Sequence, residues 1–205
     1  MHSERIEELC EFCPTLLERY WFNGPLMSCG SAVAIPAVGS LVPGYLLVLP
    51  LRHVVNASLL SPGERAEFAD FVQSVQVRLS AVYDRPVTMF EHGGCESEER
   101  PRSSCVDHAH VHLVPGVYNL PAATPGRPER HDSWCEFMES EPKGPYLACS
   151  DADGTVWQFP DVRRPQFYRR VVAKSLGMAD HWDYALHPQW ENVRRTYADF
   201  SSARD

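Results

Sequence analysis

The sequence predicts an α+β fold, in which short strands and amphipathic helices occur in one chain. Two observations carry this prediction. Apolar runs bounded by turn residues are typical of strands, and one long stretch has apolar residues at helical spacing behind a clear helix start. The 205 residues are 44% hydrophobic and 22% charged, enough to bury a core in one domain with an extension.

The N-terminal elements are expected to be a short helix and two strands. Residues 4–20 place apolar side chains near helical spacing, with Pro14 as a break or restart. Residues 31–36 and 46–50 are apolar runs, and the Pro-Gly pair at 43–44 between them is a turn signal. The second run is apolar enough to be a strand covered on both faces.

A capped helix is predicted next, over residues 61–83. Ser61 is a suitable N-cap, Pro62 suits the first turn, and Glu64 follows the serine by three residues. Apolar side chains then recur at helical spacing to about Tyr83. This segment is therefore expected to pack one face on the core.

Two more strands and two irregular segments should follow. Residues 86–91 and 105–114 are expected to be strands, and the second alternates apolar and polar side chains. The polar residues 93–104 between them are expected to form a mobile loop. Residues 115–130 contain four prolines and two glycines, which predicts a linker.

The C-terminal part is expected to contain a hairpin and two helices. Residues 146–150 and 155–159 flank an Asp-Gly turn at 151–154. Residues 165–177, ending near a glycine, and residues 188–203 have helical patterns.

Charge and cysteine content exclude some classes of function. The formal net charge of −8 argues against a nucleic acid polymer or an anionic membrane as partner, although a small anionic ligand stays open. The most apolar stretch, residues 40–51, is short and contains prolines, and the N-terminus is too polar for a signal peptide. Seven cysteines, an odd number, favour thiols and metal ligands in a reducing compartment, so the cytoplasm is expected.

Three alternating histidines are the sharpest chemical feature: His108, His110 and His112. On a strand they would share one face, roughly 7 Å apart, while Ala109 and the other intervening apolar residues face the core. Such a trio can bind one metal ion. Alternatively, one imidazole attacks an electrophile while its neighbours hold the anion, because neutral imidazole is a nucleophile near pH 7.

A Cys-x-x-Cys pair, Cys10 and Cys13, is the second feature. Two such thiolates can bind one tetrahedral zinc, although a redox pair or two buried thiols is the alternative. No second pair of this kind is present, so the remaining ligands would be histidines. His53 and one histidine of the trio are the natural candidates.

Four separated segments together resemble the histidine-triad family. The segment His-Ala-His-Val-His-Leu-Val at 108–114 is similar to the family signature, and residues 43–53 resemble its strand ending in Pro-x-x-His. Phe-Glu-His-Gly at 90–93 and Cys-Val-Asp-His at 105–108 resemble the segments that lead into the triad. The resemblance covers about half the chain, roughly residues 10 to 115.

The resemblance implies an antiparallel sheet with flanking helices and a nucleotide substrate, and it leaves a homodimer open. It further implies hydrolysis or transfer of a nucleoside monophosphate through a nucleotidyl-histidine on His110. That ring would be held by the backbone carbonyl of His112. Structural Zn²⁺ would be bound by four residues: Cys10, Cys13, His53 and His108.

Further site residues follow from the same resemblance. His112 would act with His110 in catalysis and contact the phosphate. The expected substrate-binding residues are His92, Ser104, Cys105, His112 and Ile35. His92 stands where an asparagine is common in the family, so packing alone is the alternative to a phosphate contact for this residue. The chain departs from the family where Ser-Ser-Cys at 103–105 replaces Gly-Gln-Ser, and where Ala37 stands at the ribose-binding aspartate.

We expect a nucleotide-binding catalytic domain over residues 1–116 and an extension over 117–205 packed on it. The pair Arg169 and Arg170 in the extension could grip a phosphate, although a solvated helix face is the alternative. Trp157, Trp182 and Trp190 are expected in the core rather than as a base-stacking platform.

The sequence thus predicts a nucleotidyl hydrolase or transferase acting at the α-phosphate. The rival enzyme is a hydrolase in which all three histidines bind a catalytic metal ion. The alternative without catalysis is a nucleotide-binding module.

Overall fold

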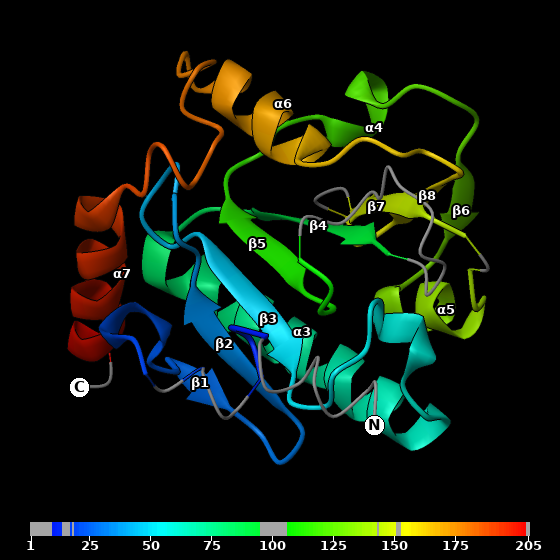
Figure 1. The fold of residues 1–205 in the computed structure, drawn as a ribbon, viewed down its shortest axis with the longest axis horizontal. Helices are drawn as coiled ribbons and strands as arrows, with labels where there is room; N and C mark the ends of the chain where they lie inside the picture. The colour runs from blue at the N-terminus through cyan, green and yellow to red at the C-terminus, as the bar shows by residue number, and fades with distance from the viewer. Residues whose placement is uncertain are drawn as a thin grey trace.

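The computed structural model describes residues 10–13, 17, 19–94, 106–142, 144–150 and 153–203. Within these residues, eight strands form one sheet in the order β1-β2-β3-β5-β4-β7-β8-β6, and all neighbouring strands are antiparallel (Figure 1). The strands are β1 (Met27–Ser28), β2 (Ala32–Pro36), β3 (Leu46–Pro50), β4 (Val87–Gly93), β5 (Val111–Pro115), β6 (Glu129–His131), β7 (Tyr146–Ser150) and β8 (Val156–Pro160). The helical elements are η1 (Trp21–Asn23), η2 (Ala57–Leu59), α3 (Pro62–Tyr83), α4 (Leu120–Ala123), α5 (Trp134–Glu139), α6 (Phe167–Ser175) and α7 (Trp190–Ser202).

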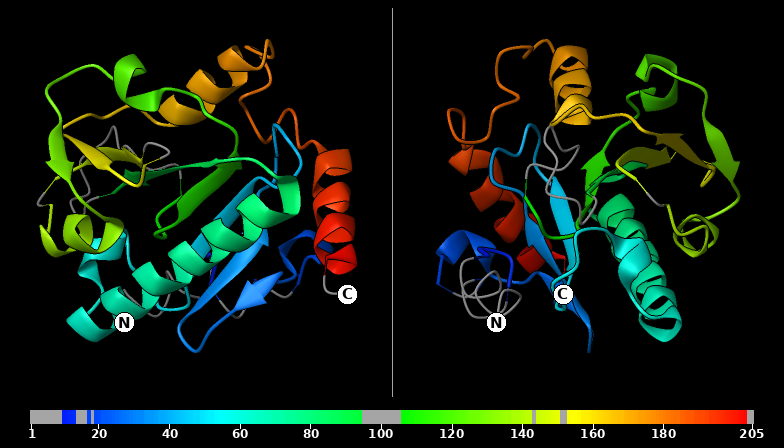
Figure 2. Two further views of the ribbon diagram at one scale, coloured as in Figure 1. Left: turned by 180° about the vertical axis from the view of Figure 1, so that it is seen from behind. Right: turned by 45° about the vertical axis from the view of Figure 1, so that its right-hand side comes forward.

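Helices cover both faces of the sheet. Helix α3 crosses one face and α6 lies on the opposite side (Figure 2). In β3, Leu46 and Val48 join the apolar cluster under α3, whereas Leu47 and Leu49 join the cluster that includes α6. The expected α+β fold with an antiparallel sheet and flanking helices is therefore confirmed, as is the prediction that β3 is buried on both faces.

The capped helix is confirmed. Helix α3 spans Pro62–Tyr83, and the Glu64 carboxylate accepts hydrogen bonds from the backbone N–H and the hydroxyl of Ser61, at 2.8 and 2.7 Å. Side chains at helical spacing then bury one face of the helix against β2, β3 and β5. Local capping chemistry alone was enough to locate this helix start.

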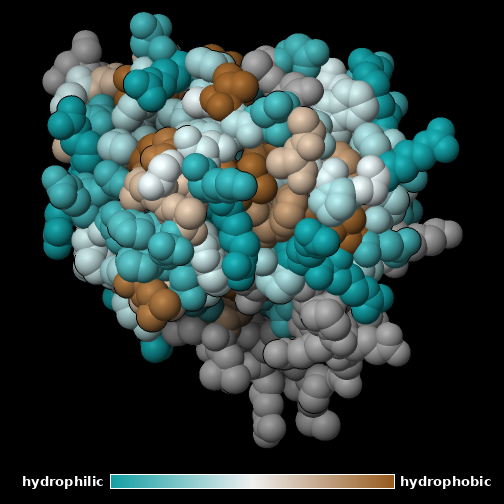
Figure 3. Space-filling model, turned by 90° about the horizontal axis from the view of Figure 1, so that it is seen from above, coloured by the Kyte–Doolittle hydropathy of each residue, from teal (hydrophilic) through white to brown (hydrophobic). Residues whose placement is uncertain are grey.

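The predicted C-terminal elements are also confirmed. Strands β7 and β8 form an antiparallel pair, and α6 and α7 lie inside the two ranges expected to be helical. Gly177 follows α6 with a φ of +72°, a conformation that favours glycine. On the face that carries α6, hydrophilic side chains surround a smaller central group of apolar ones (Figure 3).

The expected strand over 105–114 is wrong at its start, because β5 begins only at Val111. The pairing of β5 with β3 ends at Val48↔Val111. Further along, β3 reaches Pro50, which has no N–H for a ladder bond. The Ala109 N–H instead donates to the Val54 carbonyl at 2.6 Å. His108 and His110 therefore lie in the irregular segment before the strand.

The expected linker over 115–130 is also wrong in part. It contains the short helix α4, and β6 begins at Glu129 and pairs with β8. The short helix α5 was not expected, although Ser133 accepts a hydrogen bond from the Glu136 N–H at 3.1 Å as an N-cap.

Two further expectations fall largely outside the described residues. Most of the helix expected over 4–20 and the loop expected over 93–104 cannot be compared. The division at residue 116 stays a prediction, and β7, β8 and β6, all beyond it, extend the sheet that contains β4. Among the described residues, no helix is both long and apolar enough to cross a membrane.

Candidate active site and metal centre

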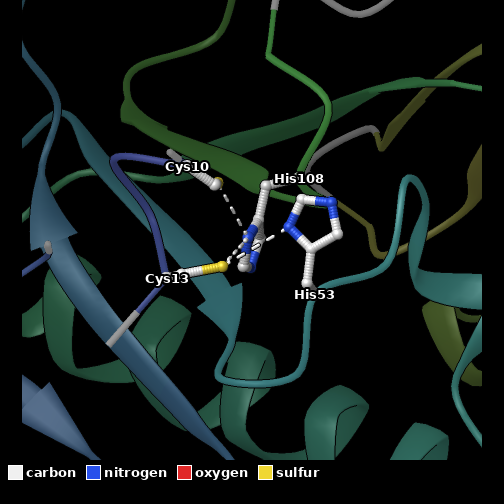
Figure 4. A group of neighbouring side chains, drawn as sticks. All are labelled: Cys10, Cys13, His53 and His108. Carbon is white, nitrogen blue, oxygen red and sulfur yellow. Dashed lines mark hydrogen bonds between the residues drawn. The ribbon is translucent and has the colours of Figure 1, made fainter. Parts of the chain in front are cut away.

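Two cysteines and two histidines converge between the N-terminal turn and the sheet (Figure 4). Sγ of Cys10 lies 3.5 Å from Nδ1 of His108, and Sγ of Cys13 lies 3.4 Å from Nδ1 of His53. All four donor atoms lie within 4.8 Å of one another. The four residues predicted from sequence are thus brought together, and they could hold a metal ion.

The outer ring nitrogen of His108 is also fixed. Its Nε2 lies 2.8 Å from the Pro50 carbonyl at the end of β3, so the Nε2–H donates and Nδ1 is left as a ligand atom. Burial lowers the pKa of His108 to about 4, which keeps this imidazole neutral. A neutral imidazole with its second nitrogen held by a carbonyl is the usual form of a histidine metal ligand.

His110 is oriented by the residue two positions before it. Its Nδ1 lies 2.7 Å from the His108 carbonyl, so Nδ1–H donates to that oxygen. The prediction that the carbonyl of His112 holds this ring is wrong: because the chain before Val111 is not in the sheet, the His108 carbonyl is free to turn toward the ring. No described residue hydrogen-bonds Nε2 of His110, and His110 lines a pocket.

His112 lies in β5 and is held from two sides. Its Nδ1 is 3.0 Å from the Tyr45 hydroxyl, and its ring stacks on Phe90 with centroids 4.4 Å apart. The centroids of His110 and His112 are 4.8 Å apart, closer than the roughly 7 Å expected for alternate residues on a strand. Of these two residues, only His112 belongs to the strand.

His92, at the end of β4, is held by the first turn of α6. Its Nε2 accepts a hydrogen bond from the Tyr168 N–H at 3.2 Å, so the ring carries its proton on Nδ1. The His92 and His112 rings meet edge to face, with centroids 5.8 Å apart. His92 thereby joins the C-terminal part of the chain to the histidine cluster.

Burial keeps these imidazoles neutral. It is the largest cause that lowers the pKa of His110, of His112 and of His92, the last to about 3. Neighbouring imidazoles and the Arg169 guanidinium lower the pKa of both His112 and His92 further, and Arg169 lowers that of His110. The hydrogen bond to the His108 carbonyl acts in the opposite direction on His110.

One pocket of about 160 Å³ brings four of the predicted site residues together: Ile35, His92, His110 and His112. The predicted substrate-binding residues Ser104 and Cys105 lie outside the described residues. Their expected roles, and the substrate-binding role of Ile35, stay predictions.

Several solved structures of histidine-triad proteins are similar to this chain. One, a HIT family member from Bacillus subtilis, has 15% identity and a TM-score of 0.44, covering 60% of this chain and 82% of that protein. A hypothetical histidine triad nucleotide-binding protein from Sulfolobus tokodaii has 18% identity and a TM-score of 0.43, with coverages of 64% and 87%. A HIT family protein from Bacillus anthracis has 18% identity and a TM-score of 0.43, with coverages of 52% and 72%. With TM-scores below 0.5, these matches do not by themselves assign a family.

No family model and no curated protein matches the sequence.

Sequence reasoning missed three residues that shape this pocket. Tyr45 holds His112, and Phe12 packs its ring edge against His108 and His110 at centroid distances of 6.1 and 5.6 Å. Gln166 lines the pocket from the start of α6. The position of Phe12 inside the Cys-x-x-Cys pair was a usable signal, since a residue between two ligands of one metal must lie close to the other ligands.

The arrangement can perform nucleophilic chemistry. It presents a neutral imidazole with one ring nitrogen fixed by a carbonyl and the other unbonded within the described residues, and Arg169 lines the same pocket. Those are the requirements for attack on an electrophile that carries negative charge.

Proposed function

We propose that this protein is a nucleotide hydrolase or nucleotidyl transferase that acts at the α-phosphate through a covalent intermediate on His110. The observation that carries the proposal is the 2.7 Å hydrogen bond from Nδ1 of His110 to the His108 carbonyl. This bond selects the tautomer whose lone pair is on Nε2, in a ring that lines the pocket. The resemblance of the sequence to the histidine-triad family adds the expectation of a nucleotidyl substrate.

In the first step, the Nε2 lone pair of His110 forms a bond to the α-phosphorus while the bond from phosphorus to the leaving group X breaks. X departs with that electron pair and takes up a proton from solvent. The positive charge that develops on the His110 ring is stabilised by the His108 carbonyl, which keeps the Nδ1–H.

In the second step, water or another acceptor bonds to phosphorus through its oxygen. The P–N bond breaks, its electron pair returns to Nε2, and one proton of the acceptor passes to solvent. In this scheme Tyr45 donates its hydroxyl proton to Nδ1 of His112, so that Nε2–H of His112 can donate to a phosphoryl oxygen.

We infer that the metal centre holds structural Zn²⁺. Zn–S bonds of about 2.3 Å and Zn–N bonds of about 2.0–2.1 Å separate the two kinds of ligand by roughly 3.5 Å in a tetrahedron. The Sγ–Nδ1 distances of 3.4, 3.5 and 3.8 Å fit this geometry. Four protein ligands would close the coordination sphere, so the ion would hold the N-terminal turn against the sheet.

The rival hydrolase with all three histidines on one catalytic ion has less support. Nδ1 of His108 lies among the cysteine sulfurs, and Nδ1 of His110 is bonded to a carbonyl. Among the described residues, the group able to hold a metal ion includes neither His110 nor His112.

The experiment is mass spectrometry of the protein quenched during incubation with dinucleoside polyphosphates, nucleoside phosphoramidates and nucleotide sugars. We expect a nucleoside monophosphate attached to His110 in the wild-type protein and no such mass in His110→Ala. His181→Ala serves as the control, because His181 stacks on His187 outside the pocket lining. A nucleotide on any other residue, or one that persists in His110→Ala, contradicts the mechanism. Binding without turnover in both proteins would favour a nucleotide-binding module.

A further inference from the structure

A buried cation lies in the wall of the pocket, and it comes from the C-terminal part of the chain. Arg169 is the third residue of α6 and is only 4% exposed. Its Nε donates to the Trp182 carbonyl at 3.0 Å, and its Nη2 donates to the Gly39 carbonyl at 2.8 Å. These bonds fix the guanidinium in the same pocket that His110 lines. Arg169 is the one lysine or arginine among the described residues of that lining.

The charge of Arg169 has no carboxylate partner in the described part of the chain. Glu11, the carboxylate that also lines the pocket, is exposed and forms no ion pair with it. Nη1 likewise finds no acceptor among these residues. The rings of Tyr45 and Tyr184 face the guanidinium at 5.3 and 5.9 Å, which supports a cation without neutralising it. A buried guanidinium of this kind is stable when an anion completes its surroundings.

The loop after β2 is shaped to receive this side chain. Gly39 has a φ of +72°, and a Cβ there would lie 2.7 Å from Nη2 of Arg169 and 2.5 Å from Cβ of Tyr184. The start of α6 also brings Gln166 to the pocket, and the Oε1 atom of Gln166 is buried with no hydrogen-bond partner. The guanidinium of Arg169 in α6 and the amide oxygen of Gln166 just before the helix are therefore left with hydrogen-bonding capacity that a ligand in the pocket can use.

We propose that Arg169 is a phosphate-binding residue of this pocket, supplied by the C-terminal part of the chain. A planar guanidinium with a free edge suits two oxygens of a phosphate better than a point charge does. The assignment of a nucleotide phosphate rests on the proposed function, whereas the binding of an anion by Arg169 requires no catalysis by His110.

The test is calorimetric titration of the full chain with AMP, GMP, CMP and UMP and with their four parent nucleosides. For the base that binds best, Arg169→Gln should weaken monophosphate binding roughly 10- to 100-fold and leave nucleoside binding unchanged. Arg169→Lys should fall between the two. Arg170→Gln is the matched control, because this substitution removes the same charge from the same helix. Unlike Arg169, Arg170 is exposed and lies over the Trp182 ring.

Equal weakening of nucleoside and monophosphate in Arg169→Gln would overturn the proposal, as would no change in either or an effect of the same size in Arg170→Gln. Failure of wild-type protein to bind any of the eight compounds would also overturn it. If the Arg169 variants do not fold, titrations of the wild-type protein provide the test. It must bind the monophosphate at least about tenfold more tightly than the nucleoside, and inorganic phosphate must compete for the site at constant ionic strength.

Failure of the phosphate-binding role of Arg169 and failure of the covalent mechanism on His110 give different results. A wild-type protein that forms no adduct on His110 but loses phosphate preference in Arg169→Gln would refute the covalent mechanism alone. An adduct on His110 combined with an unchanged phosphate preference in Arg169→Gln would refute the phosphate-binding role alone.

Discussion

Replacing His92 with asparagine should flatten the dependence of stability on pH. In the folded protein Nε2 of His92 accepts the Tyr168 N–H, so a second proton could bind only by breaking that bond. Burial is the main cause that lowers the pKa of His92 from 6.5 to about 3, and the nearby charges of His110 and Arg169 lower it further. Asparagine can still accept the Tyr168 N–H through its side-chain oxygen, but it does not titrate.

The size of the effect follows from this shift. Below pH 6.5 the unfolded chain binds a proton at His92 that the folded chain does not, so the stability present above pH 6.5 is lost as the pH falls. From pH 7 to pH 5 this single group removes about 2 kcal/mol from the free energy of unfolding. For a chain of this length, that corresponds to about 4–8 °C in Tm.

Urea unfolding of wild-type protein and His92→Asn at half-unit steps from pH 5 to pH 7 measures the difference directly. Other buried histidines titrate in both proteins, so only the difference between the two profiles is diagnostic. His92→Phe separates the two contributions: it should share the flattened profile but be about 1–3 kcal/mol less stable at every pH, because the Tyr168 N–H loses its acceptor. Parallel profiles of wild type and His92→Asn would refute the reasoning.

The remaining predictions concern the metal centre, the triad and the core. Wild-type protein should contain one zinc per chain by elemental analysis, and Cys13→Ser should lose it while Cys135→Ser, outside the cluster, keeps it. Tyr45→Phe removes the partner of His112, and the rate of adduct formation should fall about tenfold, less than the 100-fold or more for removing a donor outright; an unchanged rate would refute this role. Leu113→Ala empties a fully buried position in β5 and should cost about 2–5 kcal/mol in urea unfolding, and a loss below about 1 kcal/mol would contradict the packing.

Local signals predicted much of the fold. The start of α3 depends on Ser61, Pro62 and Glu64, which lie within one turn, and the β7–β8 hairpin depends on a short turn between two apolar runs. The strand β6 had no such signal. It has three residues, and it is defined by pairing with β8, as in His131↔Val156 across 25 positions. Residues 115–130 have the proline-rich composition of a linker, but the last of them belong to β6 and so to the sheet.

The sequence predicted which residues form the candidate site better than it predicted how they are arranged. The four possible metal ligands and the pocket position of His110 followed from motif spacing and the family resemblance. The carbonyl that orients His110 did not, because its choice depends on where β5 begins. The β3–β5 pairing stops at Val48↔Val111, and two residues later the Pro50 carbonyl accepts a hydrogen bond from His108.

The pocket wall formed by the loop between β2 and β3 could not be predicted from the sequence, because contacts with the C-terminal part of the chain hold it in place. Besides the bond from Arg169 to the Gly39 carbonyl, three hydrogen bonds join the loop between β2 and β3 to that part. The Gly39 N–H donates to the Pro188 carbonyl at 2.8 Å, the Gly44 N–H donates to Thr196 at 2.8 Å, and Asn192 donates to the Ser40 carbonyl at 2.7 Å.

These bonds hold in place the loop on which Arg169 rests. Because the contacts join residues about 150 positions apart, no local pattern in the sequence reveals them. A pocket wall assembled in this way is fixed before any ligand arrives, so binding need not order the loop. If Arg169 binds the phosphate as proposed, the charge for it comes from α6, which contacts this loop through the Gly39 carbonyl.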